Sequence, residues 1–165
     1  MLAKLVSGGQ TGVDRAALDI ALELGLPCGG WCPQGRLAED GPIPPHYPLI
    51  DTPSADYAER TLWNVRDSDA TLVLNHGALD GGTALTIEHA LALGRPFLIV
   101  DLDAQGDVAA LHAWILAYQV RVLNVAGPRE SKRAGIHARA SAFLRKALSQ
   151  GTTAQFLGAR PLRTR

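Results

Sequence analysis

The sequence predicts an α/β fold with a mainly parallel central sheet. Apolar runs typical of strands alternate with helix-like segments along most of the chain, and several of these runs contain no polar residue. Uninterrupted apolar strands are typical of parallel sheets that helices cover on both faces. Glycines and polar residues gather in the segments after the strands, where ligands bind in such folds. These observations predict both the fold class and the edge of the sheet that holds a site.

The first third of the chain contains two expected strands and one helix. A strand is predicted over Leu2–Val6, followed by a glycine-rich turn and a helix over Ala16–Leu24. A glycine and then a proline follow this helix and mark its end. Cys28–Cys32 is predicted to be a short second strand. The proline-rich segment Pro33–Ser54 is too long for an ordinary connection, so we expect an irregular, functional loop there.

The rest of the chain continues the alternation. Ser54 is expected to cap the next helix. The further predicted helices are 55–66, 84–93, 108–118 and 136–148, and the further strands are 70–74, 97–100 and 120–125. We expect one domain over residues 1–150 and an irregular, basic tail over 151–165.

Composition excludes several classes of protein. The 16 lysines and arginines balance 16 acidic residues, which argues against a general nucleic-acid binder. No apolar run is long enough to cross a membrane, and the start of the chain has no signal-peptide pattern, so we expect a cytoplasmic protein. The two cysteines and five histidines show no metal-ligand spacing, so no metal site is predicted.

The turn after the first strand is the main candidate for a ligand site. A strand, a glycine-rich turn and a helix N-terminus together present free backbone N–H groups and the positive end of the helix dipole to an anion. Glycines let the backbone turn sharply and approach the ligand. The candidate residues are Ser7, Gly8, Gly9, Gln10, Thr11 and Gly12.

This turn matches neither standard phosphate motif. Val13 stands where the lysine of a P-loop would be, and no acidic residue closes the second strand as in dinucleotide-binding folds. A second glycine turn, Gly81, Gly82 and Thr83, also enters a helix. Two such turns predict a phosphorylated, nucleotide-like ligand and weaken the ATPase and dehydrogenase interpretations.

Charged residues near these turns allow several roles. Arg36, Arg60 and Arg129 are candidates for binding a phosphate or carboxylate. Three roles are open for Asp14: interaction with the helix dipole, an ion pair with Arg15, or contact with the ligand. If the protein is an enzyme, Glu39 and Glu88 are the candidate acid/base residues, since no serine-nucleophile motif is present.

Ten blocks of sequence, in the same order, resemble the molybdenum cofactor carrier proteins. The similarity extends from Leu5 to about Leu148. These blocks are residues 7–15, 30–33, 35–36, 38–41, 47–49, 60–61, 64–65, 67–71, 81–83 and 124–131. That family resembles a circularly permuted branch of a Rossmann-like superfamily, which also contains the lonely-guy phosphoribohydrolases.

The resemblance implies a Rossmann-like three-layer sandwich, a homo-oligomer, and a site that binds the molybdenum cofactor as cargo without catalysis. It places the ligand against residues 7–12, Arg36 and residues 81–83. The alternative is a nucleotide-processing enzyme similar to the phosphoribohydrolases, which carry P-G-G-x-G-T-x-x-E. Here Asp80 replaces the proline and Ala84-Leu85 replace Gly-Thr, although Glu88 keeps its spacing. That departure weakens the enzyme interpretation.

Overall fold

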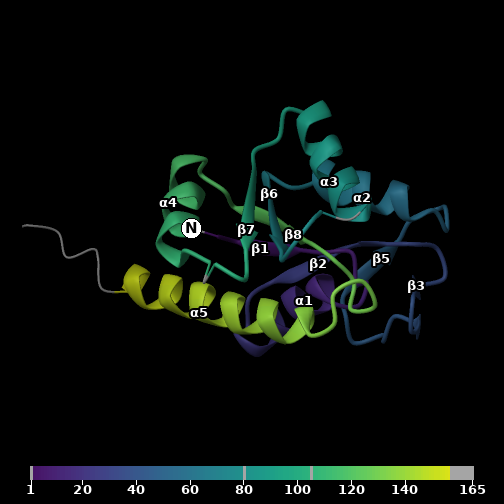
Figure 1. The fold of residues 1–165 in the computed structure, drawn as a ribbon, viewed down its shortest axis with the longest axis horizontal. Helices are drawn as coiled ribbons and strands as arrows, with labels where there is room; N and C mark the ends of the chain where they lie inside the picture. The colour runs from purple at the N-terminus through teal and green to yellow at the C-terminus, as the bar shows by residue number, and fades with distance from the viewer. Residues whose placement is uncertain (1, 80, 105, 157–165) are drawn as a thin grey trace, which may run out of the picture.

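The computed structural model describes residues 2–79, 81–104 and 106–156, and its centre is a six-stranded sheet (Figure 1). The strands lie in the order β5-β2-β1-β8-β6-β7, and every pair of neighbours is parallel. Their bounds are β1 Lys4–Val6, β2 Cys28–Cys32, β5 Leu49–Asp51, β6 Ala70–Asn75, β7 Phe97–Asp101 and β8 Val122–Ala126. The predicted α/β class and parallel sheet are confirmed.

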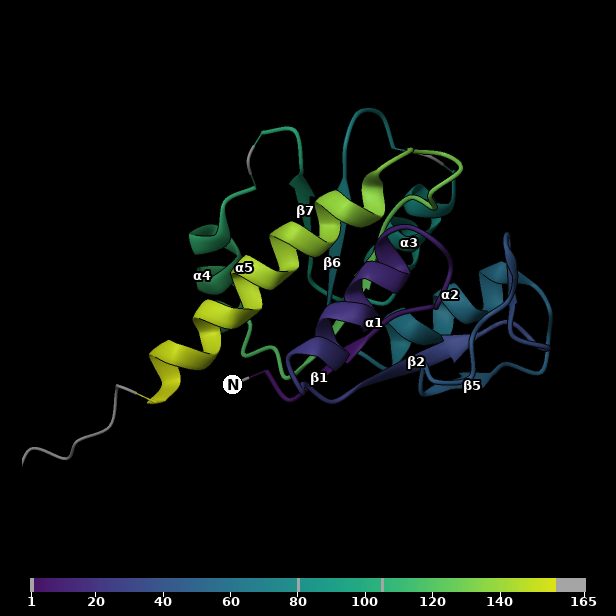
Figure 2. The same ribbon diagram turned by 90° about the horizontal axis from the view of Figure 1, so that it is seen from below.

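Five helices connect and cover these strands. They are α1 Val13–Glu23, α2 Tyr57–Arg66, α3 Gly81–Ala92, α4 Val108–Ala117 and α5 Ile136–Phe156. Helices α1 and α5 pack together on one face of the sheet, as Figure 2 shows from below, and α4 packs beside α5. Helices α2 and α3 pack together on the opposite face. The result is the predicted three-layer sandwich.

The direction of each connection explains which face its helix covers. Strand β1 leads through α1 to β2 on one side, whereas β6 leads through α3 to β7 on the other side. Parallel connections are right-handed, so steps in opposite directions place their helices on opposite faces. The chain then returns through α4 to β8, which lies between β1 and β6. A crevice between oppositely directed connections is the usual ligand site of such sheets.

The main core lies under α1 and α5. Every residue of β6 is buried, as expected of a central strand covered on both faces. Leu5, Leu72 and Leu123 from three neighbouring strands are fully buried, and Ile136 and Leu144 of α5 pack into the same cluster. A second, smaller cluster is formed by Leu18, Cys32, Ile43, Tyr47 and Leu49. This smaller cluster packs the 33–54 segment against α1.

That segment is more regular than the sequence predicts. Leu49–Asp51 forms the edge strand β5, which pairs with β2, and Leu37–Ala38 pairs with Gly41–Pro42 as a small antiparallel hairpin, β3 and β4. The prolines lie beside these short strands or at their ends. At such positions a residue does not have to donate a backbone hydrogen bond to the neighbouring strand, so the missing N–H of proline is tolerated. The expectation of an irregular loop was therefore wrong for these residues.

Several helix ends also differ from the sequence expectation, and α1 begins at Val13 rather than at Ala16. Helix α2 begins at Tyr57, and Asp56 caps it by accepting a 2.9 Å hydrogen bond from the N–H of Ala58. Ser54 instead accepts a bond from the N–H of Asp56. Helix α3 begins at Gly81, so the second glycine turn forms its first turn. Helix α5 continues to residue 156, and the rest of the predicted tail, 157–165, lies outside the described residues.

Candidate functional site

The turn between β1 and α1 is built tightly into the carboxyl edge of the sheet, where the parallel strands end. Ser7 is fully buried and its hydroxyl donates to the carbonyl of Val125 on β8, at 2.7 Å. Gly9 and Gly12 both have φ of 77°, a conformation that favours glycine. A Cβ on Gly12 would collide with the carbonyl oxygen of Pro128. The turn therefore has its shape because β8 and the loop after it lie against it.

Three glycine N–H groups of this turn remain available. The N–H of Gln10 donates to Asp14 at 3.2 Å, and the N–H of Thr11 donates to the side chain of Gln10 at 3.0 Å. In contrast, no hydrogen bond among the described residues uses the N–H of Gly8, Gly9 or Gly12. Buried backbone donors are almost always paired, so an acceptor from outside the chain suits this position.

Asp14, in the first turn of α1, pairs with Arg60 of α2. One Arg60 nitrogen, Nη1, lies 3.1 Å from Asp14 Oδ2, and Asp14 is 3% exposed. Burial raises the pKa of the Asp14 carboxyl, although Arg60 and the N–H of Gln10 oppose that shift. Arg60 also lies directly against Gly8, where a Cβ would collide with its guanidinium. The pair with Arg15 that the sequence offers is not formed, because Arg15 pairs with Asp40 and Asp14 pairs with Arg60. Asp14 does lie in the first turn of α1, beside the positive end of the helix dipole.

Glu39, in the β3–β4 hairpin, connects two loops at the site. Its carboxylate accepts hydrogen bonds from the hydroxyl of Thr11, and from the hydroxyl and the N–H of Ser131. Arg129 lies 3.8 Å from the same carboxylate. Burial favours a higher pKa for Glu39, but the bonds from Ser131 and Thr11 outweigh it and lower the pKa. The group is therefore kept ionised, which suits an anchor better than a proton donor.

A broad, open cavity of about 530 Å³ lies beside this anchor. Within it Arg15 holds Asp40 through two hydrogen bonds, and Glu130 caps α5 by accepting from the N–H groups of Gly135 and His137. The lining residues are Thr11, Gly12, Arg15, Glu39, Asp40, Glu130, Ser131 and His137. The cavity thus lies on the α1–α5 side of the first glycine turn.

The loop after β8 joins the first glycine turn to the loop after β6. Gly127 lies so close to the carbonyl oxygen of Leu74 that a Cβ added to Gly127 would collide with that oxygen. Further along this loop, Arg133 donates to the carbonyl of His76 at 3.0 Å and to that of Ala78 at 2.6 Å. The segments after β1, β8 and β6 therefore form one continuous edge, as the sequence predicts.

The second glycine turn differs from the first. Gly81 and Gly82 are exposed, and a Cβ on Gly81 would meet nothing within 4 Å. Thr83 is 2% exposed. The structure places these residues at the N-terminus of α3, on the opposite face of the sheet from α1.

Arg36 has a role inside its own loop. Its guanidinium donates to the carbonyls of Ile43, Pro44, Tyr47 and Leu49 at 2.9–3.2 Å. These bonds use four of the five N–H donors of the side chain. Arg36 therefore organises residues 43–49, and a contact with a ligand remains a prediction.

The two candidate acid/base residues lie on different elements. Glu88 is exposed on α3, whereas Glu39 is fastened between Thr11 and Ser131. The link between Glu39 and Ser131 was missed in the sequence, because the two residues are 92 positions apart and no local pattern joins them. Across residues 2–79, 81–104 and 106–156, no group of three histidine, cysteine, aspartate or glutamate side chains could hold a metal ion. No helix in that part of the chain is long and apolar enough to span a membrane.

Comparison with known proteins identifies the family. The model of the circularly permutated YpsA SLOG family matches residues 5–148. A solved structure from Syntrophus aciditrophicus SB, described as a putative molybdenum carrier protein, is 45% identical, with a TM-score of 0.85 over 89% of this chain and 95% of that one. A search of curated proteins found no match. The chain belongs to the circularly permutated YpsA SLOG family, which confirms the resemblance drawn from its motifs.

Proposed function

We propose that this family member is a carrier, which binds the molybdenum cofactor or a related phosphorylated pterin or nucleotide and releases it unchanged. The observation that carries the proposal is the set of unused N–H groups on Gly8, Gly9 and Gly12, in the turn between β1 and α1, of which Gly12 is the N-cap of the helix. Backbone donors beside the positive end of a helix dipole suit a phosphate. The ligand would extend from residues 7–12 toward residues 81–83 along the carboxyl edge.

The similar protein from Syntrophus supports the choice of cargo. Its description as a molybdenum carrier is a property of that protein, and 45% identity over most of both chains makes a related ligand a reasonable proposal here. Arg36 would act indirectly, by holding residues 43–49, because Leu49 and Ile43 of that segment pack against Gly9.

Binding without catalysis fits the ionised state of the Glu39 carboxyl group. A general acid needs a pKa near the working pH, whereas the hydrogen bonds from Ser131 and Thr11 lower the pKa of Glu39. Glu88 lies exposed on α3. These features favour a carrier over the nucleotide-processing alternative.

Equilibrium binding of the purified protein to the molybdenum cofactor tests the proposal, with Gly9→Ala as the site variant. Its new Cβ would collide with Leu49 and strain a φ of 77°. Gly25→Ala is the matched control, because it strains a φ of 65° at the far end of α1 but meets no atom within 4 Å. We expect Gly9→Ala to lose most of the affinity and Gly25→Ala to keep it. Wild-type protein that fails to bind the cofactor would reject the molybdenum cofactor as the cargo.

Incubation with nucleoside monophosphates tests the alternative directly. We expect no release of free base by the wild-type protein. Release that is lost in Glu88→Gln or Glu39→Gln would instead identify an enzyme and reject the carrier proposal. The homo-oligomer and the cytoplasmic location that the sequence suggests stay predictions.

A further inference from the structure

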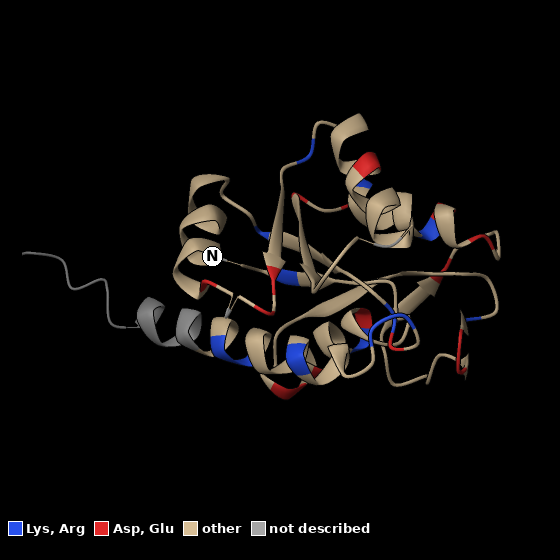
Figure 3. Cartoon of the chain, in the orientation of Figure 1, with Lys and Arg blue, Asp and Glu red and all other residues tan. Residues whose placement is uncertain are grey.

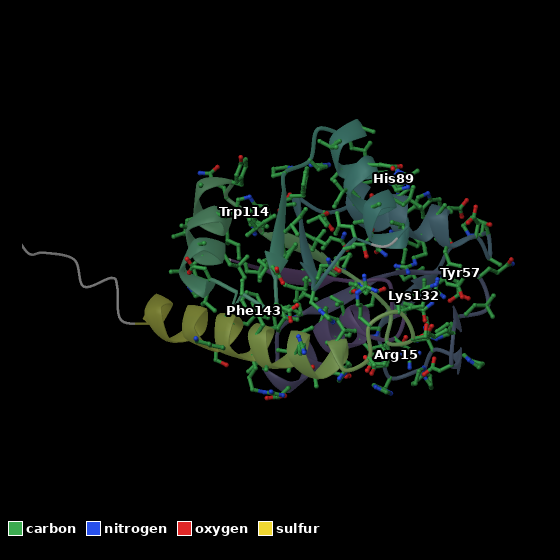
Figure 4. The ribbon with its side chains drawn as sticks, viewed as in Figure 1. Arg15, Tyr57, His89, Trp114, Lys132 and Phe143 are labelled. Carbon is green, nitrogen blue, oxygen red and sulfur yellow. The ribbon has the colours of Figure 1, made fainter. Side chains whose placement is uncertain are left out.

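Two arginines from distant segments lie around one tyrosine at the edge of the first glycine turn. Tyr57 is the first residue of α2 and is 38% exposed. The Cζ atoms of Arg60 and Arg129 each lie 6.0 Å from the centroid of its ring. Arg60 comes one turn later on α2, whereas Arg129 comes from the loop between β8 and α5. Figure 4 shows Tyr57 and Lys132 on the same side of the molecule, away from Trp114 and Phe143.

Arg60 is held in place by its ion pair, but one of its N–H donors has no hydrogen-bond partner in the part of the chain that the structure describes. Its Nη1 pairs with buried Asp14, and its guanidinium covers Gly8. Its Nε is buried and has no hydrogen-bond partner among the described residues. The side chain is only 14% exposed, so this donor has little contact with solvent. An unpaired buried donor is costly unless a water molecule or a ligand supplies the acceptor, so this nitrogen is suited to a ligand oxygen.

Arg129 supplies a second positive charge on the open side. Its side chain is 40% exposed, and its ion-pair partner, Glu39, is 3.8 Å away and already accepts bonds from Thr11 and Ser131. Figure 3 shows that basic residues gather on the loop leading into α5, which carries Arg129. At 6.0 Å from the ring centroid, both guanidinium groups lie at the outer limit of cation–π attraction to Tyr57.

We propose that Arg60 and Arg129 form a clamp for the phosphate group of the ligand at Gly8, with Tyr57 and Asp14 as positioning residues. The proposal rests on the proposed function for the class of ligand, a ring system that carries a phosphate. Two guanidinium groups match the charge of a phosphate monoester, which is about −1.5 to −2 near neutral pH. Their planar N–H groups match its oxygens, and Gly8, whose N–H is free, lies directly against the Arg60 guanidinium.

Guanosine monophosphate and guanosine are suitable probes, because they differ only in the phosphate. We expect the wild-type protein to bind the monophosphate about tenfold or more tightly than the nucleoside. Arg129→Ala should remove that preference and leave the weak binding of guanosine unchanged. Arg66→Ala is the matched control: Arg66 also lies on α2 and over an aromatic ring, 4.7 Å from the centroid of Trp63, but outside the clamp.

Two further variants separate positioning from folding. Arg60→Ala leaves Asp14 buried without its partner and is expected to destabilise the fold, so Arg60→Lys is used instead. A lysine keeps the positive charge but lacks the planar N–H donors with which a guanidinium group binds two phosphate oxygens. The preference for the monophosphate should therefore fall. Tyr57→Ala should reduce the preference, and Tyr57→Phe, which keeps the ring, should restore it.

The outcomes distinguish the clamp from the carrier proposal. Equal binding of monophosphate and nucleoside by the wild-type protein, or an unchanged preference in Arg129→Ala, overturns the clamp. If the molybdenum cofactor binds with the same affinity to Arg129→Ala, the carrier proposal stands and the clamp is rejected. If the monophosphate binds through Arg129 but the cofactor does not bind at all, the clamp stands and the molybdenum cofactor is rejected as the cargo.

Discussion

The two glycine turns at the carboxyl edge look alike in sequence but are built differently. In the first, Gly8, Gly9 and Gly12 each lie against another segment, and a Cβ on any of them would collide with Arg60, Leu49 or Pro128. In the second, Gly81 is exposed and a Cβ there would meet open space. The first turn is thus part of the core, whereas the second lies at the surface. Only the surroundings of each turn show this difference.

Gly12→Ala should have the largest effect on stability. The variant combines a strained φ of 77° with a collision against the backbone of Pro128, which cannot move without moving the β8 loop. We expect a loss of about 3 kcal/mol in the free energy of unfolding, from strain and overpacking together. Denaturant unfolding measures it, and Gly25→Ala, which is strained without a collision, should lose only about 1 kcal/mol. Equal losses would contradict the structural role of the Pro128 contact.

Arg36→Ala should have the next largest effect. It removes four hydrogen bonds to carbonyls of residues 43–49, the segment that packs on Gly9, and should cost about 2 kcal/mol. Arg36→Lys should not recover this loss, because an ammonium group cannot reach four separate carbonyls. Thermal unfolding compares the two. Full recovery in the lysine variant would show that charge alone matters at this position.

The link between Glu39 and Ser131 should weaken in acid. The folded pKa of Glu39 is lowered below its ordinary value of 4.5, so the stabilisation is complete above 4.5 and is lost as pH falls through the lowered pKa. The difference in melting temperature between wild type and Glu39→Gln should therefore be constant near neutral pH and shrink in acid. Asp40 titrates in both proteins and cancels in this comparison. A difference that grows in acid would contradict the assigned direction.

Gly81→Ala should have the smallest effect on stability and the clearest effect on binding. Its Cβ meets no atom, and alanine favours a helix more than glycine does, so stability should rise by at most about 1 kcal/mol. If the ligand approaches the N-terminus of α3, the added methyl group should weaken cofactor binding in a fully folded protein. Unchanged affinity would restrict the site to the first glycine turn.

The sequence by itself determined the architecture and the position of the first turn. Apolar runs such as 70–74 are local, and their continuity follows from burial on both faces of a parallel sheet. The glycine turn after β1 could be located for the same reason, since a strand, a turn and a helix follow one another in the chain. The strand β5 was missed because its pairing with β2, not its own proline-rich composition, makes it a strand.

Only the tertiary structure decided how the charged side chains are used. Arg36 was a candidate for binding an anion, but the carbonyls of its own loop take four of its donors. Asp14 pairs with Arg60, 46 positions away, and Glu39 with Ser131, 92 positions away. Such partners depend on which distant segments the sheet brings to one edge, and a charged residue carries no local signal of the group it will face.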